Sequence, residues 1–202
     1  MSELSPDKSN NRQIVSDGFR HLSNIISKRI EQLAGCHFVF IPGPDDPYLG
    51  TFLPRPPLPH SLFEVMDKIP NCSFASNPCR IQYADQEIVI LRDDLIEKMC
   101  RNSIHMPSAT TDIAEHFCRT IASAGHLTPL PLHISPVFWQ MDYCLRLYPL
   151  PDLVVIADQF QQFAISKHQC LFANPGSFAR SKLEFHVYYP CRREIEPCNI
   201  DE

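Results

Sequence analysis

The spacing of apolar positions changes along the chain, and it predicts helices and strands in turn. From Phe19 to Leu33 apolar residues recur every three or four positions, which predicts an amphipathic helix. Asp17 is placed to cap the start of this helix, and Gly35 is placed to end it. The preceding residues 1–15 are polar, and we expect them to be disordered.

Short apolar runs bounded by proline, aspartate or asparagine predict strands, because they are too brief for several helical turns. The strands predicted in this way are 37–41, 79–83, 87–91, 153–157, 170–173 and 183–189. Further helices are predicted at 61–68, at 93–102, and from Thr110 or Thr111 to Gly125. This alternation indicates the α/β class, with one domain over residues 16–202.

The stretch 149–181 holds two of these strands, each followed by a polar or turn segment. Ligands of layered α/β proteins bind beyond the carboxyl ends of such strands. The loops 158–160 and 174–178 are therefore the first places to look for a functional site.

The amino-acid composition of the chain excludes some classes of protein. With 44% hydrophobic residues, the chain of 202 residues can bury a sizeable core. Its net charge of −5 provides no global basic field for nucleic acid. No run of 18 apolar residues is present, and residues 1–18 lack an apolar core, so we expect neither a membrane span nor a secretory signal.

Nine cysteines occur at scattered spacings without a C-x-x-C pair, which argues against a zinc ribbon. We interpret them as reduced thiols that pack as small hydrophobes. Nineteen prolines against six glycines indicate rigid, shaped loops, which suit docking better than a moving lid. Two proline-rich segments, 53–59 and 125–138, are the expected docking surfaces. For the stretch 47–59, which contains the first of them, a rigid connector is the alternative interpretation.

Candidate metal ligands are few. Asp45 and Asp46 follow the strand 37–41, and Asp158 follows the strand 153–157. A two-metal phosphoesterase site needs Asp, Asn and His ligands from several strand ends. Neither loop supplies a histidine, so a structural aspartate turn is the favoured interpretation and an ion site the alternative. His126 and His133 are interpreted as core or interface histidines.

Other catalytic motifs lack support. Ser177 is not set in the strand–turn–helix pattern of a nucleophile elbow. Neither G-x-x-x-x-G-K-[ST] nor G-x-G-x-x-G occurs, so nucleotide binding has no motif. The arginines are dispersed among acidic residues, which indicates a mixed, solvated surface.

Seven segments together carry a resemblance to a known family. They are FVFIPGPDDP (38–47), LPRPPLP (53–59), NPCRIQY (77–83), EKMCRN (97–102), GHLTPLPL (125–132), YPLPDLVVIAD (148–158) and NPGSFARS (174–181). In these segments the chain resembles the B subunits of eukaryotic DNA polymerase epsilon, from about Phe38 to Tyr189. The resemblance implies the C-terminal part of a degenerate calcineurin-like metallophosphoesterase domain, a layered β-sandwich flanked by helices. The family's upstream strands and OB-fold would then be missing.

The resemblance also implies lost metal ligands. Active relatives would carry G-N-H-[DE] where this sequence has Gly43 followed by Pro44, Asp45 and Asp46. They would carry G-H-x-H where it has Ala157, Asp158, Gln159 and Phe160. The degenerate ligand positions are therefore Pro44, Asp45, Asp46, Asp158 and Phe160. Because the family's metal ligands are replaced at these positions, we expect neither catalysis nor a bound metal or other cofactor.

By resemblance, the function is that of a non-catalytic accessory subunit in nuclear DNA replication. The implied partner is the catalytic subunit of DNA polymerase epsilon, through its cysteine-rich C-terminal module, with DNA reached through the holoenzyme. Buried aromatic and arginine side chains commonly anchor interfaces. On that basis Arg55, Phe138 and Trp139 are the expected interface residues, with a core position as the alternative for Trp139. A metal-dependent nuclease using Asp45, Asp46, Asp158 and His126, and direct DNA binding by this chain, are the rival hypotheses.

Overall fold

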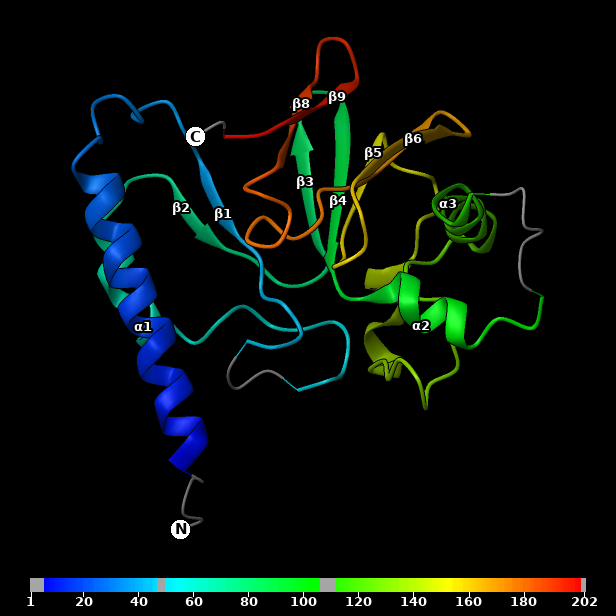
Figure 1. Ribbon diagram of the computed structural model, residues 1–202, viewed down its shortest axis with the longest axis horizontal. Helices are drawn as coiled ribbons and strands as arrows, with labels where there is room; N and C mark the ends of the chain where they lie inside the picture. The colour runs from blue at the N-terminus through cyan, green and yellow to red at the C-terminus, as the bar shows by residue number, and fades with distance from the viewer. Residues whose placement is uncertain (1–5, 47–49, 106–111, 201–202) are drawn as a thin grey trace. The chain divides into compact units, whose positions relative to one another are not determined.

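The computed structural model describes residues 6–46, 50–105 and 112–200. Within these ranges the chain mixes helices and β-sheets, as the hydrophobic pattern predicted (Figure 1). It divides into two compact units. Unit 1 comprises Met1–Gly50 and Arg55–Ser76, and unit 2 comprises Thr51–Pro54 and Asn77–Glu202.

Unit 1 is built on the helix α1 (Pro6–Ser27), which differs from the predicted helix at both ends. It starts within the segment expected to be disordered, because Pro6 suits the first turn of a helix. Residues 28–35, which the prediction included, form hydrogen-bonded turns. The predicted cap Asp17 therefore lies inside α1, where it pairs with Arg20 instead.

The rest of unit 1 consists of short elements. The predicted strand at 37–41 is β1 (Phe38–Phe40), which pairs in parallel with β2 (Cys72–Phe74), a strand that we did not predict. The predicted helix at 61–68 is two 3-10 segments, η1 (His60–Leu62) and η2 (Glu64–Lys68). The core of the unit is small: Ile26, Met66 and Ile69 are buried, with phenylalanine rings packed around them.

Unit 2 contains a five-stranded mixed sheet in the order β3-β4-β5-β7-β6. The bounds of its strands are β3 Cys79–Tyr83, β4 Gln86–Arg92, β5 Leu153–Ala157, β6 Phe163–Lys167 and β7 Cys170–Asn174. The predicted hairpin is confirmed as the antiparallel pair β3–β4, while β4, β5 and β7 run parallel. β6, an edge strand that we did not predict, pairs antiparallel with β7.

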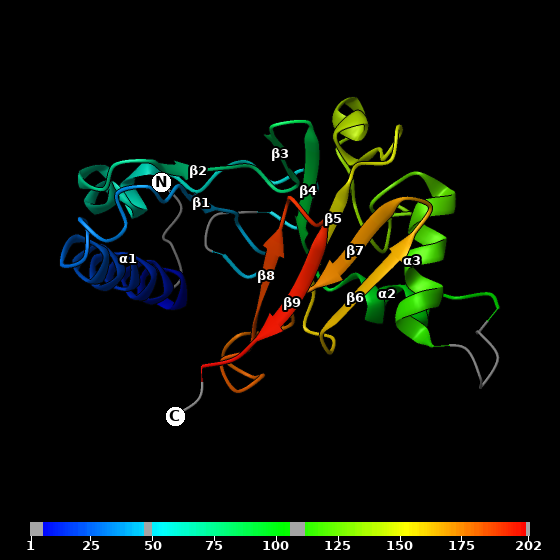
Figure 2. The same ribbon diagram turned by 90° about the horizontal axis from the view of Figure 1, so that it is seen from above.

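Two helices pack with this sheet, and α3 lies along β6 (Figure 2). α2 (Leu95–Arg101) is shorter than the predicted helix at 93–102. α3 (Ile113–Ala124) starts at Asp112, whose side chain accepts a hydrogen bond from the Ala114 N–H at 3.2 Å. The predicted caps Thr110 and Thr111 lie outside the described residues. Gly125 ends α3 as predicted, in a left-handed conformation with φ of 61°.

The remaining elements of unit 2 lie outside the main sheet. The 3-10 helix η3 (Trp139–Leu145) was not predicted. The predicted strand at 183–189 is β8 (Phe185–Tyr189), which forms a hairpin with the unpredicted β9 (Glu194–Cys198). The core of unit 2 draws on α2, α3 and the central strands, and it includes Phe117, Ile121 and Ile156. None of the described helices is long and apolar enough to cross a membrane.

Candidate functional site

The carboxyl ends of three parallel strands meet at one edge of the unit 2 sheet. β4 leads into Asp93 and Asp94, β5 leads into Asp158, and β7 ends at Asn174. We call these four residues the strand-end corner. Ligands of layered α/β proteins are commonly bound at such an edge, so the corner is the natural place for chemistry.

Backbone N–H groups engage the carboxylate of Asp158. Its Oδ2 accepts a hydrogen bond from Ile96 at 2.9 Å, and its Oδ1 accepts one from Phe160 at 2.9 Å. Burial raises the pKa of Asp158, and these backbone hydrogen bonds offset part of that rise. Since Ile96 lies in the first turn of α2, Asp158 satisfies an N–H that has no partner within the helix.

Protein donors also occupy the other oxygen atoms of the corner. Asn174 Oδ1 accepts from the N–H of Asp158 at 3.2 Å and from that of Gly176 at 2.9 Å. Asp94 accepts from the backbone N–H and the side-chain amide of Gln159, at 3.1 and 3.0 Å. The corner is therefore a network in which acids and amides hold loops and a helix start together.

A cavity of about 410 Å³ opens at the corner. Its acidic lining residues are Asp94, Glu97 and Asp158, and Phe160 supplies an apolar wall. In the part of the chain that the structure describes, no group of three or more His, Cys, Asp or Glu side chains is arranged to hold a metal ion.

The other predicted metal position is the turn after β1, in unit 1. Asp46 Oδ2 accepts a hydrogen bond from the Gly43 N–H at 2.6 Å, and Pro44 and Asp45 form the turn between them. The turn is thus closed by one of its own aspartates. Because Asp45 and Asp46 belong to unit 1 and Asp158 to unit 2, the candidate ligands are divided between the two units.

His126, the remaining candidate ligand, is hydrogen-bonded at both ring nitrogens. Nδ1 accepts from the Thr128 N–H at 3.1 Å, so Nε2 carries the proton that it donates to Asp142 at 3.2 Å. Arg146 binds the other oxygen of the same carboxylate at 3.0 Å. Partial burial raises the pKa of Asp142, but the hydrogen bonds from Arg146 and His126 outweigh it and leave the pKa below its ordinary value.

Large apolar side chains are exposed around η3. We call Phe52, Phe138, Trp139, Met141 and Tyr143 the η3 surface; each of them has more than 40% of its area exposed. The rings of Phe52 and Phe138 are in contact, with their centroids 5.1 Å apart. Exposed groups of large apolar side chains are typical of interaction sites.

The three expected interface residues differ in exposure. Phe138 and Trp139 are 52% and 76% exposed, so Trp139 is not a core residue. Arg55 is 3% exposed and belongs to unit 1. The role of all three in binding stays a prediction.

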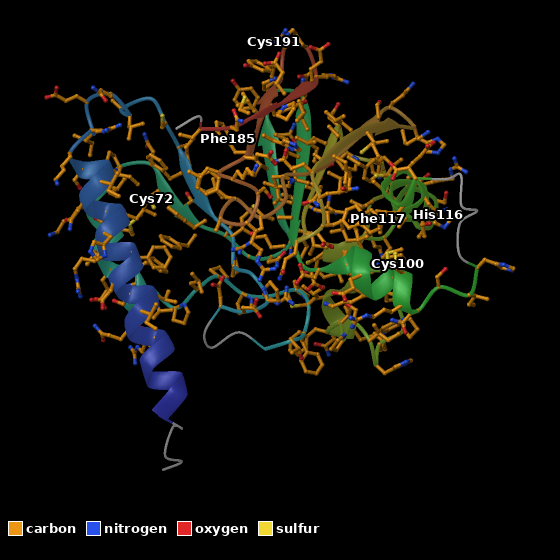
Figure 3. The ribbon with its side chains drawn as sticks, in the orientation of Figure 1. Cys72, Cys100, His116, Phe117, Phe185 and Cys191 are labelled. Carbon is orange, nitrogen blue, oxygen red and sulfur yellow. The ribbon has the colours of Figure 1, made fainter. Side chains whose placement is uncertain are left out.

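A second cavity, of about 250 Å³, lies between α2 and α3. Cys100 from α2 and His116 and Phe117 from α3 contribute to its mainly apolar lining (Figure 3).

Sequence reasoning missed part of both sites. Asp93 and Asp94 follow the predicted strand 87–91 directly, so the strand-end rule that selected Asp158 would have selected them too. Met141 and Tyr143 had no comparable signal, because WQMDYCL has neither helical nor strand periodicity. Phe52 also had no sequence signal, because a single aromatic residue before a proline-rich segment is too common to indicate a site.

The fold and these sites define a mixed α/β protein. Acidic side chains hydrogen-bond the loops at the carboxyl edge of its sheet, and large aromatic side chains are exposed around η3. A family model that describes the B subunits of DNA polymerases alpha and epsilon matches residues 5–165. The chain therefore belongs to this B subunit family of DNA polymerases alpha and epsilon, as the resemblance of its motifs predicted.

Its relatives include epsilon subunits from animals and plants. The chain is 47% identical over 196 residues to the DNA polymerase epsilon subunit 2 of Bos taurus, covering 96% of this chain and 37% of the relative. It is 44% identical to the probable DNA polymerase epsilon subunit 2 of Caenorhabditis elegans, with coverage of 96% and 37%. It is 39% identical to the B subunit of DNA polymerase epsilon from Arabidopsis thaliana, with coverage of 90% and 35%. The chain thus spans little more than a third of the length of these relatives.

Among solved structures, the crystal structure of TT1561 of Thermus thermophilus aligns with 93% of this chain and 79% of its own. The TM-score is 0.43 and the sequence identity is 14%.

Proposed function

We propose that the chain acts as part of a non-catalytic accessory subunit of DNA polymerase epsilon. In this role it binds the cysteine-rich C-terminal module of the catalytic subunit and takes part in DNA replication in the nucleus. Membership of the B subunit family and the names of the relatives support this proposal. DNA is reached through the holoenzyme, in keeping with the net charge of −5.

The observation that carries the proposal is the exposure of the η3 surface. Trp139 and Tyr143 are 76% and 62% exposed, although aromatic rings of this size lose much favourable burial when they remain in water. A protein partner that covers them would recover that free energy. Phe138 and Trp139 are therefore the proposed interface residues, and Arg55 remains a further candidate.

We also propose that the domain is a degenerate calcineurin-like phosphoesterase domain. Its former ligand positions would be Pro44, Asp45, Asp46, Asp158 and Phe160. Two bonding patterns support this: Asp46 closes its own turn at Gly43, and Asp158 accepts from two backbone N–H groups. A carboxylate that caps backbone has less capacity left for a cation.

The direct test is co-expression of this chain with the C-terminal module of the catalytic subunit, followed by tandem affinity purification. Stoichiometric co-purification that survives washing is the expected result. Recovery of each protein alone, with both of them soluble, would contradict the proposal.

A second candidate function is metal-dependent phosphodiester hydrolysis, favoured by the acidic cavity of about 410 Å³ at the strand-end corner. Of the four residues expected for it from the sequence, Asp158 lines this cavity, whereas Asp45 and Asp46 belong to unit 1 and His126 lies elsewhere in unit 2. Titration with manganese in the presence of a phosphodiester substrate separates the two functions. We expect no metal-dependent turnover; turnover that Asp158→Ala abolishes would establish a hydrolase at this cavity, and turnover that Asp46→Ala abolishes would establish one at the turn after β1.

A further inference from the structure

The cavity of about 250 Å³ between α2 and α3 extends from solvent into the hydrophobic core of unit 2. Ile96 and Phe117 line it, and these core residues are only 2% and 4% exposed. Ile104 and Ile113 line it as well, and they are 96% and 39% exposed. Water in an apolar opening of this kind makes few hydrogen bonds, so an apolar molecule that displaces it gains affinity.

Few polar side chains line the cavity, and most of them are already hydrogen-bonded. Thr120 donates a hydrogen bond to the carbonyl of His116 at 2.9 Å, and Asn102 and Ser103 donate to nearby carbonyls at 2.7 and 2.6 Å. Among the described residues, nothing hydrogen-bonds to the ring of His116 or to the thiol of Cys100. None of the described lining residues is aspartate, glutamate, lysine or arginine. The cavity therefore suits a neutral molecule with one polar group.

The volume of the cavity limits the size of its ligand. An apolar cavity of about 150 Å³ inside a protein holds benzene, a single ring. In the same proportion, a cavity of about 250 Å³ has room for about ten non-hydrogen atoms, the size of two fused rings. Phe117 in the wall favours aromatic rings, because aromatic pairs attract each other beyond the effect of their burial.

We propose that this cavity binds a neutral bicyclic aromatic molecule that carries one hydrogen-bonding group, with the ring of His116 as the partner of that group. The inference goes beyond the proposed function, which assigns the chain no small-molecule ligand. Indole is the matching probe, since its two fused rings carry a single N–H from which the His116 ring can accept a hydrogen bond. Adenine is the matched control: it also has two fused rings, but polar atoms surround them, and this wall would leave most of those atoms unpaired at a cost in free energy.

The test is an NMR titration of the chain, isotopically labelled in its isoleucine methyl groups, with indole and with adenine. The methyl signals of Ile96, Ile104 and Ile113 should shift on addition of indole and give a dissociation constant of about 1 mM. The signals of Ile26 and Ile69, which lie in the core of unit 1, should not move. Adenine should leave all of these signals in place.

Two leucine substitutions on α3 provide a matched comparison. Thr120→Leu adds apolar bulk in the wall of the cavity and should weaken indole binding roughly tenfold, whereas Ser123→Leu adds the same side chain at an exposed position and should leave it within about twofold. His116→Phe keeps a ring in the wall but removes the hydrogen bond, so it should weaken binding roughly fivefold. Circular dichroism shows that each variant is folded.

Three results would overturn the inference. They are the absence of shifts at the three lining isoleucines up to about 10 mM indole, equal shifts with adenine, and wild-type affinity for indole in Thr120→Leu. Wild-type affinity in His116→Phe would overturn the assignment of His116 as the hydrogen-bonding partner.

Discussion

Asp158 shows how one carboxylate can take a structural role at a position suited to chemistry. It is 5% exposed and accepts hydrogen bonds from two backbone N–H groups, those of Ile96 and Phe160. Removing a buried acceptor leaves its donors unpaired, which costs more than the bond itself contributes.

We predict that Asp158→Ala lowers the free energy of unfolding by about 1–3 kcal/mol. Asp158→Asn, which keeps one acceptor oxygen, should lower it by less. Urea denaturation followed by circular dichroism measures both variants. An unchanged midpoint in Asp158→Ala would show that these bonds contribute nothing.

The stability contribution of Asp158 should also depend on pH. Burial raises its pKa in the folded state above the value in the unfolded chain, which is about 3.9. The folded state therefore binds the proton more tightly, so this contribution is fully present below the unfolded-state pKa and is lost as pH rises through the folded-state pKa. The stability difference between wild type and Asp158→Asn should therefore shrink as the pH rises above about 4 and through the folded-state pKa. A difference that grows over this range would contradict the assignment.

The cysteines provide a second prediction at this scale. All nine are free, in agreement with their interpretation as reduced thiols. Burial raises the pKa of both Cys118 and Cys170 to about 12, and only the thiolate reacts rapidly. Cys36 and Cys191 are exposed, and Cys191 lies at the tip of the β8–β9 hairpin (Figure 3).

Brief treatment of the folded protein with iodoacetamide should therefore alkylate Cys36 and Cys191 and spare Cys118 and Cys170. Peptide mass spectrometry reads the sites, and the same treatment in urea provides the control in which all four react. Alkylation of Cys118 in the folded protein would show that the packing of α3 against the core of unit 2 does not shield this thiol.

At the scale of elements, hydrophobic pattern predicted the strands that lie in the core. β4 and β5 combine β-branched residues with clear turn boundaries, and both appeared as predicted. β6 and β9 were missed, because edge strands and isolated hairpins contain more polar residues and have a weaker pattern. η3 was missed since a 3-10 helix of seven residues has no 3.6-residue period to detect.

Two glycines give opposite predictions for their helices. Gly18 lies inside α1 with no atom within 4 Å of an added Cβ, so Gly18→Ala should stabilise the protein by about 0.5–1 kcal/mol. Gly125 also has open space, but its φ of +61° strains any other residue, so Gly125→Ala should destabilise by about 1–2 kcal/mol. Thermal unfolding of the two variants compares them directly. The same sign of change in both would contradict one of the two backbone assignments.

For the whole molecule, the two units differ in the size of their cores. The buried hydrophobic cluster in the described part of unit 1 consists of Ile26, Met66 and Ile69, whereas that of unit 2 spans α2, α3 and the central strands. The sequence did not predict this division, because the proline-rich segment 53–59 was interpreted as a connector or docking surface within one domain. Local composition does not show how contacts are distributed between distant segments.

The rate of backbone amide hydrogen exchange should be higher in unit 1, which has the smaller core, than in unit 2. Among the described strands, β2 is the single partner of β1, whereas β5 has two partners, β4 and β7. We expect amides of β1 and β2 to exchange faster than those of β5, because local opening is easiest where few buried contacts hold an element. Exchange of β1 at the rate of β5 would show that unit 1 is as stable as unit 2.

Under the proposed function, this chain binds the catalytic subunit of DNA polymerase epsilon and does not itself catalyse a reaction. Sedimentation velocity of the chain mixed with the C-terminal module of that subunit tests the claim most directly. We predict a single faster-sedimenting species of one-to-one composition. Two species that sediment separately at micromolar concentrations, with both proteins folded, would contradict the claim.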